Sequence, residues 1–357
     1  MKRFLSRVLP LLLSFGLIFN CTGCSTVLVL AGKARENSEA SSSVISESSA
    51  SSGVISTPVP TEDGDLRAFY TDVANAESVT VMVYMIGSDL ESEDGSATDD
   101  LLEMANAALS ENVHLVLQTG GTETWWNDVC TDDESERFVI ENGDMTLLQS
   151  LGSMNMTDAD TLSDFIRFSA ESYPADRYEL ILWDHGGGTM TGFGYDELYE
   201  DTSLTLSSLS TALYNGGVQF DFIGFDACLM ATAEVAYALD PYADYLIASE
   251  ESEPGEGWAY KNWLTMLAED PAVPTAELGK KLADDFLEAY IFADMPTLSV
   301  LDLRYVPELY AALESYWGSA YTALQSGSYG AFSQVRSNVR EFGDNEYCLL
   351  YTSDAAD

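Results

Sequence analysis

The chain has 357 residues, 46% of them hydrophobic, which is enough for one large domain or two modest ones. It carries 15 basic and 59 acidic residues, a formal net charge of −44. A surface this acidic repels phosphate backbones, so nucleic acid is excluded as an expected partner, while cationic peptides and metal ions stay compatible with it. Acidity of this kind also keeps an exported protein soluble without any specific partner.

The N-terminus predicts an export signal. Basic residues precede an apolar run over residues 8–19, and small residues follow. The next string, Cys21-Thr22-Gly23-Cys24, resembles a bacterial lipoprotein cleavage box, which predicts a signal peptide over 1–23 and lipidation of Cys24. The alternative is an uncleaved membrane anchor, because a second apolar run over 26–31 brings the two runs close to the length of a bilayer span.

Residues 24–70 are expected to form the lipid anchor and a flexible stalk. Nine serines fall within residues 41–56, and such a segment cannot bury enough apolar surface to offset its ordering entropy. The expected location is therefore the outer face of the cell membrane, with the membrane as a partner through the lipid.

Residues 75–347 are expected to form one domain in which strands and helices alternate. The apolar patterns predict strands over 79–87, 113–119, 178–183, 219–225, 245–249 and 298–303, helices over 99–110, 158–172, 229–239, 275–291 and 306–324, and a hairpin over 136–151 that turns at Asn142-Gly143. This succession predicts a doubly wound α/β sheet.

The last ten residues, 348–357, resemble the translation of a sequencing adapter rather than a natural protein end. We therefore expect the natural domain to continue beyond residue 347. An ordinary chain end is the alternative.

Two predicted strands end in residues that can perform nucleophilic or acid/base chemistry. One is the run from Ile181 to Gly188, which contains His185, and the other is the run from Phe222 to Cys228. The carboxyl ends of parallel strands meet at one edge of a sheet, where ligands of such sheets bind. We therefore expect His185 and Cys228 to share one crevice.

A cysteine nucleophile has to be partly thiolate, and a helix N-terminus or a neighbouring histidine favours that form. Cys228 is predicted to lie just before the helix over 229–239, and His185 is predicted to lie beside it. The glycines that follow His185 let backbone N–H groups approach a ligand closely, as an oxyanion hole requires. The alternatives are an inert buried thiol and a histidine held in a glycine-rich turn.

Several strings together resemble the clostripain family of cysteine peptidases, in that family's order. They are Val81-Met82-Val83-Tyr84-Met85, Leu182-Trp183-Asp184-His185-Gly186-Gly187-Gly188, Gly192-Phe193-Gly194-Tyr195-Asp196, Asp226-Ala227-Cys228-Leu229-Met230, and Ala248-Ser249-Glu250-Glu251 through Pro254-Gly255 to Gly257-Trp258. The resemblance implies a caspase-like three-layer sandwich with a mostly parallel sheet flanked by helices. It also implies peptide-bond hydrolysis, with His185 as the catalytic histidine and Cys228 as the nucleophile.

The resemblance further implies that the backbone N–H groups of Gly186 and Cys228 hold the oxyanion. Members of the family often cleave after Arg or Lys, which calls for a carboxylate in the P1 pocket. Asp226 is the first candidate and Glu256 the second. The alternatives are a helix cap or strand-end turn for Asp226 and a solvated loop charge for Glu256.

Self-cleavage at a basic residue between the histidine and the cysteine is known in the family. Residues 186–227 contain no Lys or Arg, so this chain cannot be cut there by a basic-specific activity. Either it acts as a single chain, or activation occurs elsewhere, for example at Arg177 or Lys261, or its P1 preference is not basic.

No cofactor is expected for the chemistry. Calcium dependence is known in the family, and the candidate ligands are Asp89, Glu91, Glu93, Asp94, Asp99 and Asp100. Their order does not fit an EF-hand loop, and a solvated loop with a helix N-terminus is the favoured explanation, with calcium as the alternative. The expected partners are a peptide or protein substrate, and the chain is expected to be a monomer.

Three other classes compete with the peptidase. A serine esterase lacks its GxSxG string here, and a metallohydrolase would have only His114 and His185 as imidazole ligands. The remaining alternative is a noncatalytic surface lipoprotein of the same fold that binds peptides or cell-surface polymers. Such a protein would be expected to have lost His185 or Cys228, and this chain has both.

Overall fold

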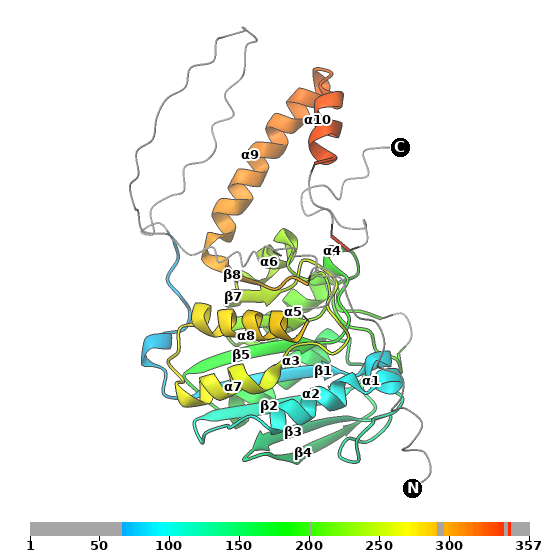
Figure 1. Ribbon diagram of the computed structural model, residues 1–357, viewed down its shortest axis with the longest axis vertical. Helices are drawn as coiled ribbons and strands as arrows, with labels where there is room; N and C mark the ends of the chain where they lie inside the picture. Colours follow the sequence, from blue (N-terminus) through cyan, green and yellow to red (C-terminus); the bar gives the residue numbers. More distant parts are fainter. Residues whose placement is uncertain (1–65, 200–201, 291–295, 339–341, 344–357) are drawn as a thin grey trace, which may run out of the picture.

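The computed structural model describes residues 66–199, 202–290, 296–338 and 342–343. It contains an eight-stranded sheet in the order β4-β3-β2-β1-β5-β6-β7-β8, drawn in Figure 1. The strands are β1 (Val79–Ile86), β2 (Val113–Gly120), β3 (Ser135–Glu141), β4 (Asp144–Gly152), β5 (Arg177–Trp183), β6 (Phe220–Asp226), β7 (Ala243–Ala248) and β8 (Ser299–Asp302). The predicted signal peptide, Cys24, the stalk up to residue 65 and the segment 348–357 lie outside the described residues.

The centre of the sheet is parallel and its edges are antiparallel. β2, β1, β5, β6 and β7 pair in parallel, whereas β3, β4 and β8 join in antiparallel fashion. All eight residues of β1 and all seven of β6 are buried, as strands covered on both faces require. The predicted mostly parallel sheet is confirmed.

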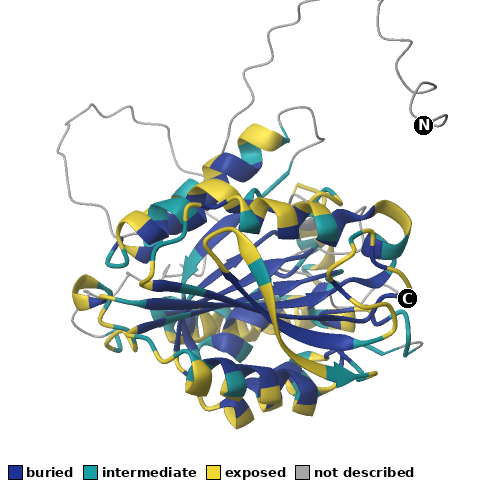
Figure 2. Ribbon diagram, turned by 90° about the horizontal axis from the view of Figure 1, so that it is seen from below, coloured by how far each residue is buried: buried dark blue, intermediate teal, exposed yellow. Residues whose placement is uncertain are grey.

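Helices cover both faces of the sheet, as Figure 2 shows by the dark blue strands between two helical layers with yellow outer sides. One layer holds α2 (Ser96–Ala105), α7 (Tyr260–Glu269) and α8 (Thr275–Ala289), and the other holds α3 (Ala159–Ser172), α5 (Leu206–Gly216) and α6 (Ala233–Leu239). Alternate residues of β1 point to opposite faces of the sheet and belong to separate hydrophobic cores. Val81 and Val83 pack with the first helical layer, and Met82 and Tyr84 pack with the second. The α/β three-layer sandwich is confirmed.

The chain reverses its direction of travel across the sheet at β1. From β1 it passes through α1 (Ser88–Asp94) and α2 to β2, β3 and β4 on one side, and then returns through α3 to β5, β6 and β7 on the other. The carboxyl ends of β1 and β5 therefore flank the topological switch point. Open α/β sheets bind ligands in the crevice at this point.

Two predicted helices have different bounds in the structure. The helix predicted over 99–110 is α2, which begins at Ser96 and ends at Ala105. The acidic stretch before it forms a separate helix, α1, and Gly95 in the left-handed conformation at φ 75° separates the two. The helix predicted over 229–239 is α6, which begins only at Ala233, after a side-chain cap from Thr232 to the Val235 N–H. Helix α7 was not predicted.

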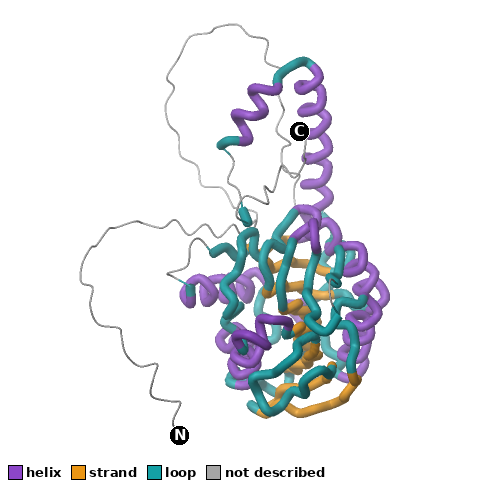
Figure 3. Tube along the Cα trace, turned by 90° about the vertical axis from the view of Figure 1, so that its right-hand side faces the viewer, coloured by secondary structure: helices purple, strands orange, loops and turns teal. Residues whose placement is uncertain are grey.

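The C-terminal described helices leave the sandwich. Helix α9 (Val306–Gln325) stands away from the body, with α10 (Tyr329–Arg336) beside it, as Figures 1 and 3 both show. Of α9, only Val306 and Ala320 are buried. The remaining short elements are α4 (Gly188–Thr191) after β5 and two 3-10 turns, Val73–Asn75 and Leu303–Tyr305. Across the described ranges, we find no helix that combines the length and apolarity needed to cross a membrane.

Candidate active site

His185 and Cys228 lie at matched positions beyond two neighbouring strands. Trp183 of β5 pairs with Asp226 of β6, and each of the two residues follows two positions later. A Cβ placed on Gly186 would lie 2.0 Å from the backbone oxygen of Cys228, so the two loops are in direct backbone contact. The structure thus brings His185, Gly186 and Cys228 together, and their chemical roles stay predictions.

The thiol of Cys228 does not lie at a helix N-terminus, contrary to the expectation from the sequence. Residues 229–231 pair instead with the loop after β7, where the Leu229 N–H donates to the Glu251 carbonyl at 3.1 Å. Leu229 is held in the left-handed region at φ 65°, a strained conformation for a leucine. Sequence reasoning missed this because the run Leu229-Met230-Ala231 is apolar enough to continue a helix.

The thiol is covered by the same loop. The Glu253 N–H donates to the sulfur of Cys228 at 3.2 Å. Burial raises the pKa of the Cys228 thiol, and the Glu253 N–H lowers it in part. The resting cysteine is therefore favoured as a thiol, so it needs a base to become a nucleophile.

The ring of His185 is held by a carboxylate that the sequence analysis placed only among calcium candidates. Nε2 of His185 lies 2.7 Å from Oδ1 of Asp89, the second residue of α1. The Tyr195 ring lies edge-on at a centroid distance of 6.4 Å, and the His185 carbonyl accepts the Gly194 N–H at 2.9 Å. The sequence gave no direct signal for the Asp89 contact, because 96 residues separate the pair.

Backbone N–H groups are available where an oxyanion hole is expected. In the glycine-rich loop the Gly187 N–H donates to Gly192 at 2.8 Å. The N–H groups of Gly186 and Cys228 donate to no backbone carbonyl among the residues that the structure describes. Two donors at touching loops can therefore serve one oxygen of a bound ligand.

The carboxyl group of Asp226, two residues before the cysteine, is buried. It accepts hydrogen bonds from the Trp258 N–H at 3.1 Å and from the Tyr260 hydroxyl at 2.7 Å. Burial raises the pKa of Asp226 to about 6, which these two hydrogen bonds oppose. Asp226 ends β6 and the cap of α6 is Thr232, so the alternative of a helix cap for Asp226 is wrong.

Two further buried carboxyl groups accompany Asp226. Gly257, at φ 65°, approaches both Asp226 and Asp100 so closely that a Cβ there would lie 2.9 Å from one carboxylate and 3.1 Å from the other. Both carboxylate oxygens of Glu253 are buried and have no hydrogen-bond partner in the described structure. Burial raises the pKa of Asp100 and Glu253 well above the usual range, and the neighbouring Asp226 raises both further. Glu256, by contrast, is exposed.

The candidate calcium ligands do not converge in the described structure. Asp89 contacts His185, and Asp100 accepts the Trp183 indole N–H at 2.6 Å. Glu91 is fully buried and accepts the Trp126 N–H at 2.6 Å. Within the described residues no group of three or more His, Cys, Asp or Glu side chains is placed to hold a metal ion.

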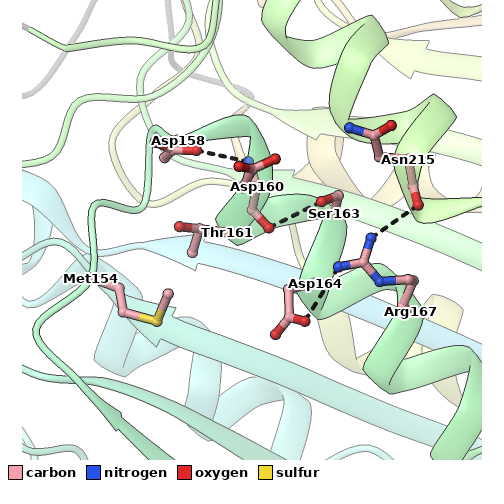
Figure 4. Close-up of a pocket in the computed structure, with 8 residues that line it drawn as sticks. All are labelled: Met154, Asp158, Asp160, Thr161, Ser163, Asp164, Arg167 and Asn215. Carbon is pink, nitrogen blue, oxygen red and sulfur yellow. Dashed lines mark hydrogen bonds and ion pairs between the residues drawn. The ribbon is translucent and has the colours of Figure 1, made fainter.

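A separate cavity of about 680 Å³ lies along α3 and is drawn in Figure 4. Its polar groups satisfy one another: Asp158 caps the Asp160 N–H at 2.8 Å, and Arg167 contacts Asp164 and the Asn215 carbonyl. None of its lining residues belongs to the strand ends that carry His185 and Cys228. The candidate active site is therefore placed at the carboxyl ends of β5 and β6 rather than in this cavity.

Known proteins resemble this chain in sequence and in fold. Clostripain from Hathewaya histolytica is 29% identical in an alignment of length 218 that covers 52% of this chain and 41% of clostripain. The chain thus spans less than half the length of that relative.

Two solved structures have a similar fold. A secreted C11 cysteine protease from Bacteroides thetaiotaomicron, in complex with an irreversible peptide inhibitor, matches with a TM-score of 0.55 and 23% identity, over 66% of this chain and 69% of that one. An inactive zymogen C11 protease from Parabacteroides distasonis matches with a TM-score of 0.52 and 27% identity, over 66% of this chain and 64% of that one. The model of the clostripain family matches residues 83–351. Because that match covers well over half of the chain, and because the fold and the strand-end strings agree with it, the chain belongs to the clostripain family.

Proposed function

We propose that this chain is a cysteine endopeptidase of the cell surface that uses Cys228 and His185 and prefers a basic P1 residue. The observation that supports the peptidase assignment is the register of β5 and β6, in which the two residues follow paired strand ends at the same offset. Membership of the clostripain family supports it. Relatives of similar fold are described as C11 cysteine proteases.

The geometry supports a two-step acyl transfer. His185 takes the proton of the Cys228 thiol, whose burial favours the protonated form. The sulfur then attacks the scissile carbonyl while the N–H groups of Gly186 and Cys228 hold the oxyanion. The C–N bond breaks as His185 returns its proton to the departing amine, and water hydrolyses the thioester that remains.

The basic P1 preference rests on the three buried carboxyl groups. Among the described residues, no lysine or arginine forms an ion pair with Asp226, Asp100 or Glu253. Buried carboxylates without a cation are costly, and each group responds with a raised pKa. A guanidinium or ammonium group from the substrate would supply the missing charge. Asp226 is the first candidate, and Glu256, exposed in the loop between β7 and α7 that also carries Glu253, is the second.

A panel of fluorogenic peptides that differ only in P1 tests this proposal. The wild type is expected to prefer Arg or Lys over Leu, and Asp226→Asn is expected to lose about 10- to 100-fold in kcat/KM for the basic substrates only, because an ionic contact with the P1 residue is removed. Glu256→Gln is the matched control at an exposed position, with a smaller expected loss. A basic preference that survives Asp226→Asn in a folded variant would remove Asp226 from the pocket.

We also propose that Cys24 carries a lipid that holds the enzyme at the outer face of the cell membrane. The support is the export pattern of the sequence and the secreted relative from Bacteroides thetaiotaomicron. Expression in a bacterium with metabolic labelling by a fatty-acid probe tests it. The wild type and Cys21→Ala should be labelled and remain with membranes, and Cys24→Ala should not be labelled. Equal labelling of all three would place the lipid elsewhere.

A further inference from the structure

We propose that Asp89 is a positioning residue that fixes the tautomer and the orientation of the His185 ring for proton transfer. The proposal rests on the proposed function for its kinetic consequences. The structural observation is independent of that function: Oδ1 of Asp89 lies 2.7 Å from Nε2 of His185, a hydrogen-bond distance between a carboxylate and an imidazole nitrogen.

The position of the pair in the sheet supports this role. Asp89 follows β1 and His185 follows β5, and these two strands are parallel neighbours at the switch point. The contact therefore joins the carboxyl ends of β1 and β5, the place at which a sheet of this kind binds its ligand. Cys228 follows β6, the next strand, so the three side chains come from three consecutive strand ends.

The segment that presents Asp89 is firmly held. The Gly87 N–H donates to the Gly120 carbonyl at 2.8 Å, which continues the β1–β2 pairing past the strand end. Two residues after Asp89, the buried Glu91 accepts hydrogen bonds from the Thr98 N–H at 2.8 Å and the Trp126 N–H at 2.6 Å. A carboxylate on a segment held in this way can restrict the orientation of the imidazole ring that it contacts.

The contact determines which ring nitrogen exchanges protons. A carboxylate only accepts hydrogen bonds, so Nε2 must carry its proton when it faces Asp89. Nδ1 is then the nitrogen that takes the proton from the Cys228 thiol, and the imidazolium that results is stabilised by the Asp89 charge. Nδ1 gives the same proton to the departing amine when the C–N bond breaks, and the ring returns to its Nε2-protonated neutral form.

The other ionisable groups near His185 cannot replace Asp89. Asp184 is its chain neighbour, but that carboxyl is buried, accepts the Tyr195 N–H, and has a pKa raised to about 7 by burial. Tyr195 presents its ring edge to His185. Cys228 is the proposed proton donor to the ring. Asp89 is thus the carboxylate placed on a ring nitrogen.

Because the pair is partly exposed, the effect of Asp89 on activity can be measured apart from its effect on folding stability. The side chains of His185 and Asp89 are 43% and 46% exposed. An exposed pair of this kind contributes little to folding. Removal of the Asp89 carboxylate should therefore leave the thermal unfolding temperature unchanged.

The first test reads the tautomer without any need for activity. The chain has two histidines, so ¹⁵N-imidazole NMR spectra are assigned by comparison with His114→Gln. The wild type should show His185 with its proton on Nε2, and Asp89→Ala should show a mixture of both tautomers. A mixed His185 signal in the wild type, or no change in Asp89→Ala, would overturn the positioning role whether or not the protein is a peptidase.

The second test compares an amide substrate with an activated ester of the same P1 residue. Asp89→Ala should lose about 10- to 100-fold in kcat/KM on the amide, whose poor leaving group needs the proton, and much less on the ester, which does not. Asp89→Glu should recover part of the loss, and Asp94→Ala, on the same helix, should have no effect.

An equal loss on both substrates, or no loss on the amide, would show that Asp89 does not act through protonation of the leaving group, and would overturn that part of the proposal. A wild type that hydrolyses neither substrate would count against the proposed function instead. In that case the NMR spectra still decide whether Asp89 sets the His185 tautomer.

Discussion

Trp183 of β5 is paired with Asp226 of β6, and the pairing continues one residue further through the Asp184 N–H and the Asp226 carbonyl, 3.3 Å apart. This register sets the relative position of the two proposed catalytic residues. His185 lies two residues after Trp183, and Cys228 lies two residues after Asp226. A slip of one residue would turn either side chain to the opposite face of the sheet. The alignment of the two proposed catalytic residues is therefore a property of the sheet rather than of the loops alone.

Gly186→Ala should disturb the contact between these two loops. The added methyl group would lie 2.0 Å from the Cys228 carbonyl oxygen, so the backbone must move. We expect a loss of about 1 to 3 kcal/mol in the free energy of unfolding and a larger proportional loss in kcat/KM, because the oxyanion donors shift with the backbone. Denaturant unfolding and peptide hydrolysis measure the two effects.

Gly318→Ala is the matched control, since a Cβ on this residue of α9 meets nothing within 4 Å. It should keep full activity and gain up to about 1 kcal/mol in stability, as alanine favours helix. Full activity in Gly186→Ala would show that the close approach at Gly186 is not required.

The buried Asp184 should make folding stability depend on pH. Burial raises its pKa to about 7, above the value of about 4 in the unfolded chain. The folded state therefore binds more protons than the unfolded state between pH 4 and 7, and the contribution of Asp184 to stability falls as pH rises through this window. Asp184→Asn cannot ionise, so it should become progressively more stable than the wild type from pH 4 to 7, by at most about 1.4 kcal/mol per pH unit.

Thermal unfolding of both proteins over this pH range checks the prediction. The difference in stability between the two proteins cancels the effect of the other acidic side chains, which both proteins share. A stability difference that is constant from pH 4 to 7, or that shrinks, would contradict the assignment of a buried, proton-binding Asp184.

The preference for basic substrates should increase with pH. Burial raises the pKa of Asp226 to about 6, so this carboxyl is mostly neutral at pH 5 and charged at pH 7. The ratio of kcat/KM for an Arg substrate to that for a Leu substrate should rise about tenfold or more over this range. The ratio cancels the ionisation of the dyad, which both substrates need. A ratio that rises equally in Asp226→Asn would assign the effect to another group.

Arg177 should be important for stability although it lies far from the chemistry. Its fully buried guanidinium contacts Asp221 at 2.7 Å and Glu179 at 3.0 Å, and it donates to the Val273 carbonyl at 2.9 Å. Arg177→Ala would leave two buried carboxyl groups without their cation, at a cost of about 3 to 5 kcal/mol. Arg167→Ala, with a side chain that is 43% exposed, should cost about 1 kcal/mol or less. Chemical denaturation compares the two variants, and similar losses would contradict this account.

The central strands could be predicted from sequence because their apolar runs are buried on both faces. The apolar runs therefore place the ends of β5 and β6 to within one residue, and with them the neighbouring positions of His185 and Cys228. Helix α7 has a sequence signal as well, since Trp263, Leu264 and Leu267 recur at helical spacing and are all buried.

The remaining features depend on contacts between distant segments. The start of α6 is delayed because Ala231 donates its N–H to Ser249 at 2.8 Å, a tertiary hydrogen bond that replaces a helical one. Glu253 lies in an acidic string typical of a solvated loop, yet its carboxyl group is buried. The contact between Asp89 and His185 follows from the order of the strands. None of these three features has a local pattern in the sequence.

The central claim, that Cys228 is the nucleophile of a peptidase, is tested most directly by a thiol-directed peptidyl probe with Arg at P1. The account predicts stoichiometric labelling of the wild type under reducing conditions, located at Cys228 by mass spectrometry, and no labelling of Cys228→Ser. His185→Ala should be labelled at a greatly reduced rate. Absence of labelling in the wild type with calcium present, or labelling of Cys130 in place of Cys228, would contradict the account.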